Sequence, residues 1–152
     1  MDSAPMLICY DGSEGARRAI GSALELFGRR HTVVVDVAPP LTTAEALASI
    51  DTVAPAFEEW NLDEAAARAE EGAVIARKAG LTAEARGAIG APTWEGVVDV
   101  ADEIDAAVIV MGSRGLTGAR EVIEGSLSHQ VAEHAGRPVL IVPPPKGHES
   151  AG

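Results

Sequence analysis

The residues of this chain best suited to binding chemistry are glycines and a serine spaced in a regular way. Gly112 and Gly115 are followed, after nine further residues, by Gly125 and Ser126. Glycine lets backbone N–H groups approach an anion without an intervening Cβ, and the first N–H groups of a helix favour negative charge. Ser126 is suited to cap such a helix or to donate its hydroxyl to a phosphate oxygen. The spacing therefore predicts a phosphate-binding loop.

The elements around this loop must place it at the edge of a sheet. Residues 107–111 form an unbroken apolar run with the length of a buried parallel strand, and Gly112 comes directly after it. Ligands of open α/β sheets bind beyond the carboxyl ends of strands. The loop has neither the lysine of a P-loop nor the G-x-G-x-x-G of a dinucleotide-binding turn, so these two motifs are excluded.

Strand and helix patterns alternate along the whole chain, which is typical of a parallel α/β sheet. We expect a single-domain, Rossmann-like fold with an open five-stranded parallel sheet and helices on both faces. Gly28, Gly80 and Gly136 are expected to stop helices, and a short helix is expected near 44–49. The expected strands are 6–10, 32–37, 82–88, 107–111 and 139–142, and the main helices are 14–26, 61–78, 93–103 and 126–135.

Length and composition indicate one acidic domain. The 152 residues fit a domain over 1–145 with a flexible tail over 146–152, and the net charge of -11 argues against nucleic acid and anionic membrane surfaces as partners. No segment reaches the ~20 apolar residues of a membrane span, and no signal-peptide pattern opens the chain. We expect a cytoplasmic protein.

The single cysteine, Cys9, lies in an apolar strand and is interpreted as a core residue.

Four segments, in the same order, resemble the ATP-binding universal stress proteins. They are residues 6–13 (MLICYDGS), 33–37 (VVVDV), the Gly90-Ala91-Pro92 turn, and the G-x2-G-x9-G-S motif with the residues that follow it. The resemblance covers the whole chain. It implies a fold like that of the adenine-nucleotide alpha hydrolases and ATP as the ligand, with Mg²⁺ as an optional companion of its phosphates.

The resemblance also implies a role for individual residues. Asp11 would contact the ribose or the base, the backbone of Val37 would hold the adenine, and Met111 would pack beside them. Arg114 is left with two interpretations, as a contact to the phosphates or as an exposed loop residue, and Arg120 shares them. The ribose and phosphate chain would be held by Gly112, Gly115, Gly125, Ser126 and Leu127.

Other interpretations of these residues involve no ligand. Asp11, Gly12 and Ser13 could simply form a turn that caps the following helix. His129 and His134 are five residues apart, which does not place them on one helix face as a metal pair, so structural or exposed roles are favoured. Trp60 and Trp94 are too isolated for a base-stacking platform and are expected to pack in the core or on the surface.

The predicted function is that of a nucleotide-dependent stress-response or signalling module. The motif supplies groups for binding but no complete catalytic set, so slow ATP hydrolysis or autophosphorylation is the alternative. A scaffold with an empty crevice is disfavoured by the intact glycines. The apolar strand 139–142, if it lies at a sheet edge, predicts a homodimer formed by pairing with its copy.

Overall fold

Five parallel strands form the centre of the protein. The structure, a computed structural model, describes residues 3–38, 54–90, 92–113 and 127–146. In this part of the chain the strands lie in the order β3-β2-β1-β4-β5 and every neighbouring pair is parallel. The strands are β1 (Met6–Cys9), β2 (His31–Ala38), β3 (Thr82–Ile89), β4 (Val108–Gly112) and β5 (Val139–Val142).

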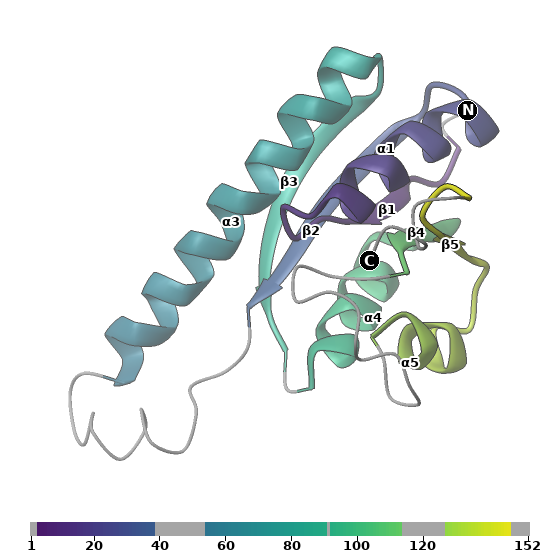
Figure 1. Ribbon diagram of the computed structural model, residues 1–152. Helices are drawn as coiled ribbons and strands as arrows, with labels where there is room; N and C mark the ends of the chain where they lie inside the picture. Colours follow the sequence, from purple (N-terminus) through teal and green to yellow (C-terminus); the bar gives the residue numbers. More distant parts are fainter. Residues whose placement is uncertain (1–2, 39–53, 91, 114–126, 147–152) are drawn as a thin grey trace.

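Four described helices cover the two faces of this sheet (Figure 1). Side chains alternate along β1, so Met6 and Ile8 join a core on one face while Leu7 joins a core on the other. The first core is closed by α1 and α3, and the second by α4 and α5. The predicted α/β fold with its five-stranded parallel sheet is confirmed. The helices are α1 (Glu14–Phe27), α3 (Ala54–Ala79), α4 (Thr93–Ile104) and α5 (Leu127–His134).

Helix ends follow the predicted glycines closely. Gly28 has a φ of 71° and its N–H donates to the Leu24 carbonyl at 2.9 Å, which ends α1. Gly80 ends α3 in the same way, with a φ of 116° and an N–H bonded to the Ala76 carbonyl at 3.1 Å. Positive φ values of this kind favour glycine, so these stops are encoded locally.

The start of α3 differs from the favoured prediction. The capping pattern favoured a start at Asn61 and left helix before it open; α3 begins at Ala54 and runs for 26 residues, which agrees with that second alternative. Pro55 is its second residue, a position where the missing N–H costs nothing and the fixed φ suits a helix. Asn61 is therefore an interior residue and not a cap. The helix expected near 44–49 lies outside the described residues, as does most of the expected tail.

In the part of the chain that is described, none of the helices has the length and hydropathy needed to cross a bilayer.

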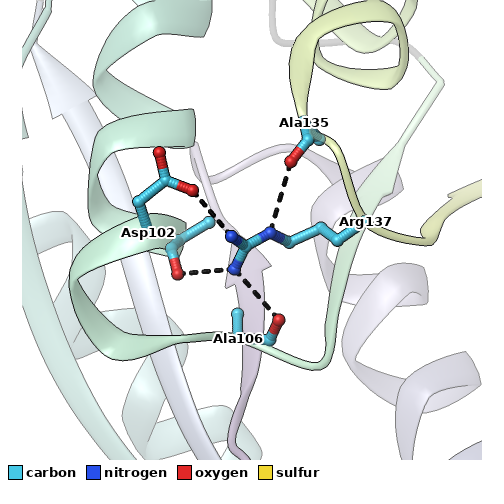
Figure 2. A network of polar contacts seen from close by, with 5 residues as sticks. Asp102, Ala106, Ala135 and Arg137 are labelled. Carbon is cyan, nitrogen blue, oxygen red and sulfur yellow. Dashed lines mark hydrogen bonds and ion pairs between the residues drawn. The ribbon is translucent and has the colours of Figure 1, made fainter.

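One arginine ties the end of α4 to the turn before β5 (Figure 2). Arg137 Nη1 donates to the carbonyls of Ala101 at 2.7 Å and Ala106 at 3.0 Å, and its Nε donates to the Ala135 carbonyl at 3.3 Å. Its Nη2 donates to Asp102 Oδ1 at 2.6 Å. The guanidinium thus links the last turn of α4 and the residue Ala106 after it to the turn before β5, which fixes β5 relative to α4.

Candidate functional site

The chain reverses its direction of travel across the sheet between β1 and β4. From β1 it moves outward through β2 to β3, and it then crosses back to β4 and β5 on the other side of β1. The carboxyl ends of β1, β2 and β4 therefore meet at a topological switch point, where ligands of open α/β sheets bind. This arrangement brings Asp11, Val37 and Gly112 to the same edge of the sheet, although up to 101 positions separate them in sequence.

The turn after β1 caps the following helix, which was the alternative interpretation of Asp11, Gly12 and Ser13. Asp11 Oδ1 accepts a hydrogen bond from the Ser13 N–H at 2.9 Å, and Ser13 Oγ accepts one from the Ala16 N–H at 3.1 Å. Gly12 between them has a φ of 89°. Ser13 is the N-cap of α1. These bonds use Oδ1 of Asp11, so the turn fixes the orientation of the carboxylate, and Oδ2 has no hydrogen bond to a described residue.

Gly112 has a packing role that the sequence did not reveal. A Cβ at this position would lie 2.8 Å from the carbonyl carbon of Gly15 and 2.9 Å from its oxygen. The end of β4 thus touches the first turn of α1 directly, backbone against backbone. Gly112 is required for this approach, and the approach places the N-terminus of α1 beside the switch point.

The other described residues of the predicted site have different surroundings. Val37 is half-buried, and its Cγ1 would lie 2.8 Å from a Cβ on Gly96, so α4 approaches β2 closely here. Met111 is 3% exposed and belongs to the core beneath α4 and α5, which suits a packing neighbour. Leu127, the first residue of α5, is exposed. The remaining predicted site residues, Arg114, Gly115, Gly125 and Ser126, lie outside the described residues.

An ion pair at the same edge was missed by the sequence analysis. Asp36, near the end of β2, is 7% exposed, and its Oδ2 accepts a hydrogen bond from Arg68 Nη1 of α3 at 2.7 Å. Burial raises the pKa of Asp36, while the charge and hydrogen bond of Arg68 lower it; the nearby charge of Asp11 raises it further, and the net shift is upward. The Asp11 and Asp36 carboxylates are thus electrostatic neighbours. The sequence signal was a lone aspartate in an apolar strand, which requires a partner when buried.

Two further groups make poor candidates for chemistry. Burial raises the pKa of the Cys9 thiol to about 12, and the charges of Asp11 and Asp36 add to this shift, so the nucleophilic thiolate is suppressed. His134 stacks on Trp94 with ring centroids 4.0 Å apart and an interplanar angle of 17°. That contact fits the predicted structural roles of both residues.

The strand order, with its switch point between β1 and β4, defines a small, doubly wound α/β protein. The model of the universal stress protein family matches residues 4–143, so the chain belongs to this family. It is 31% identical over 147 residues to the universal stress protein YxiE of Bacillus subtilis, with 90% of this chain and 97% of that protein covered.

Solved structures agree with this assignment. The structure of MJ0577 from Methanocaldococcus jannaschii is similar with a TM-score of 0.75 and 22% identity, covering 97% of this chain and 100% of that one. A universal stress protein in complex with cAMP is similar with a TM-score of 0.66 and 25% identity, covering 92% and 98% of the two chains. The first likeness supports the fold, and the second shows that a relative binds an adenine nucleotide.

Proposed function

We propose that this protein binds ATP at the switch-point crevice and acts as a nucleotide-dependent stress-response or signalling module. The observation that carries the proposal is the meeting of Asp11, Val37 and Gly112 at one sheet edge, with the G-x2-G-x9-G-S motif beginning at the end of β4. The cAMP complex of a relative supports an adenine nucleotide as the ligand class.

The described geometry fits the parts of an adenine nucleotide. Asp11 Oδ2, which has no hydrogen bond within the described part of the chain, suits a ribose hydroxyl, and the backbone of Val37 suits the adenine edge. Gly112 begins the segment whose N–H groups would bind the phosphates, and Mg²⁺ would accompany the phosphates as part of the ligand. The N-terminus of α1, held against Gly112, adds a favourable dipole for negative charge.

Binding, and not rapid turnover, is the activity that this residue set supports. Phosphoryl transfer requires a positioned nucleophile and cationic stabilisation in addition to a phosphate site. Cys9 is unsuitable as a nucleophile because its pKa is raised to about 12. Slow hydrolysis or autophosphorylation is the second candidate, and turnover at ~1 per second or faster would favour an enzyme over a module.

The test is identification and titration of the bound nucleotide. Mass spectrometry of small molecules released from purified, heat-denatured protein should find an adenine nucleotide, and calorimetry should show that ATP binds. Gly125→Val should abolish binding while Gly21→Ala, on the exposed side of α1, should leave it unchanged. ATP affinity at the wild-type level in a folded Gly125→Val protein would refute the proposed phosphate loop.

We also propose that the protein forms a homodimer through β5. Among the described strands, β5 lies at one sheet edge and β3 at the other. At the β3 edge the Ala83 carbonyl accepts a hydrogen bond from Arg77 Nε at 2.9 Å, so at least this acceptor is already paired. The β5 edge is apolar and Ile141 is 36% exposed. An open apolar edge strand favours pairing with a second copy.

The orientation of the backbone N–H groups of β5 allows the proposed dimer to be tested. The Pro138 carbonyl accepts a hydrogen bond from the Ile109 N–H of β4 at 3.0 Å, and the Val142 carbonyl accepts one from the N–H of Ser113, the residue after β4, at 3.1 Å. By alternation the N–H of Ile141 points to the open edge. Ile141→Pro removes that donor without breaking the β4–β5 ladder, and Ile141→Val retains it. Light scattering should report a dimer for wild type and Ile141→Val and a shift to monomer for Ile141→Pro. A wild-type monomer at high micromolar concentration would contradict the proposal.

A further inference from the structure

The Asp36–Arg68 pair leaves hydrogen-bond donors at the crevice. Arg68 Nη1 is bonded to Asp36 Oδ2 at 2.7 Å, whereas its Nε and Nη2 have no hydrogen bond to any described residue. The Arg68 side chain is 40% exposed and that of Asp36 is 9% exposed. The carboxylate therefore acts as a buried anchor that holds one side of the guanidinium, and the guanidinium presents its other donors toward solvent.

This guanidinium lies beside the Asp11 turn. The Arg68 Cδ atom is 3.9 Å from the position of a Cβ on Gly12, which is the residue after Asp11. Asp36 and Asp11 are close enough for the charge of one to raise the pKa of the other. Arg68, supplied by α3, thus belongs to the same group of polar side chains as the carboxylate proposed to contact the nucleoside.

The sheet order fixes which part of a nucleotide Arg68 can reach. Arg68 is anchored on β2, whereas Gly112 and the phosphate loop follow β4, on the far side of β1. Two strand spacings of about 4.8 Å separate β2 from β4, so the anchor is roughly 10 Å from the phosphate side of the crevice. A triphosphate bound at the loop that begins at Gly112 would therefore be remote from Arg68, and the nucleoside would lie near Arg68.

We propose that Arg68, positioned by Asp36, is a binding residue that donates hydrogen bonds to the nucleoside end of the bound adenine nucleotide. This inference rests on the proposed nucleotide binding and adds a nucleoside-contacting residue on α3 to it. The acceptor is an oxygen of the ribose or a ring nitrogen of the base. A planar guanidinium fixed on one side by a carboxylate presents its remaining donors in a defined direction. The position of Arg68 on the β2 side of the sheet, and not a preference of the guanidinium, selects the nucleoside as the part of the ligand that it contacts.

Calorimetry with AMP and ATP on Arg68→Gln tests the inference. We expect the affinity of both ligands to fall by about tenfold to a hundredfold, the range of a charge-assisted hydrogen bond, and by the same factor for each. Arg77→Gln is the matched control, because Arg77 is on the same helix and in an ion pair with Glu70 at 2.8 Å. Its substitution should change neither affinity.

A second variant separates binding from folding. Arg68→Gln leaves Asp36 as a buried carboxylate without its partner, which can destabilise the protein. The double variant Asp36→Asn with Arg68→Gln replaces the pair by two neutral amides that can bond to each other, and it should fold yet bind AMP and ATP as weakly as the single variant. Asp36→Asn alone should weaken both ligands by a smaller common factor, as expected for a positioning residue.

Three results would overturn the inference. Unchanged affinity in Arg68→Gln would make the pair purely structural, and a loss that is greater for ATP than for AMP would place Arg68 at the phosphates. Recovery of wild-type affinity in the double variant would show that the single variant acted through misfolding. If wild-type protein binds neither ligand, the proposed function itself fails and this inference fails with it.

Discussion

Adding one methyl group at Gly112 tests how closely β4 and α1 approach at the crevice. In Gly112→Ala the new Cβ would lie 2.8 Å and 2.9 Å from the carbonyl carbon and oxygen of Gly15, and 3.2 Å from its Cα. These are backbone atoms of a packed helix, so they cannot move away as a flexible side chain would. Overpacking of this kind costs about 1–3 kcal/mol, and replacing glycine by alanine returns about 0.4–1 kcal/mol through the unfolded state.

The net effect of Gly112→Ala should be a loss of about 1–2 kcal/mol in the free energy of unfolding. For a chain of this size that corresponds to a decrease in Tm of roughly 2–8 °C. Gly21→Ala is the matched control, because Gly21 lies in α1 with nothing within 4 Å of its Cβ position. It should stabilise the protein by about 0.5–1 kcal/mol.

Urea denaturation followed by circular dichroism measures both variants, with the slope m expected to stay constant. If Gly112→Ala stabilises the protein as much as Gly21→Ala does, the close contact between β4 and α1 does not exist. The argument that Gly112 places the N-terminus of α1 at the crevice would then be wrong.

Two further predictions concern charged side chains. Arg137→Gln should lower the free energy of unfolding by about 2 kcal/mol, because the guanidinium is 16% exposed and donates to three carbonyls as well as to Asp102. Arg86→Gln, which breaks an exposed ion pair with Glu103, should lower it by under about 1 kcal/mol. Equal losses for the two variants in urea denaturation would contradict this prediction. Burial raises the pKa of Asp36 above its ordinary value of 3.8. The native state therefore holds this proton more tightly than the unfolded state, and the resulting stability, complete below pH 3.8, is lost as the pH rises through the native pKa. The stability of wild type relative to Asp36→Asn should thus fall with rising pH above about 4, and an unchanged or increasing difference across a pH series would refute it.

The order of elements and most helix ends could be read from the sequence, because they depend on local patterns. Apolar runs of strand length and helical spacing alternate, and Gly28 and Gly80 end helices through positive φ values of 71° and 116° that few other residues adopt. The start of α3 at Ala54 was not located because the capping pattern at Asn61 favoured a later start, although helix before Asn61 was left open.

Part of the candidate site was also predicted from local sequence patterns. Asp11, Val37 and Gly112 each stand at the end of an apolar run, and the ends of parallel strands meet at one edge. The sequence could therefore name these residues as members of one crevice. It also supplied the two local interpretations of Asp11, and the structure shows that its turn does cap α1 through Ser13.

Only the tertiary structure decided which distant residues touch. Arg68 is 32 positions from Asp36, and no local pattern indicates that α3 would supply the partner of this buried carboxylate. Gly15 and Gly112 come into backbone contact because α1 crosses over the end of β4, which depends on the strand order and not on either segment alone. Periodicity specifies which face of an element is buried, whereas the identity of the neighbour on that face follows from how the whole sheet is assembled.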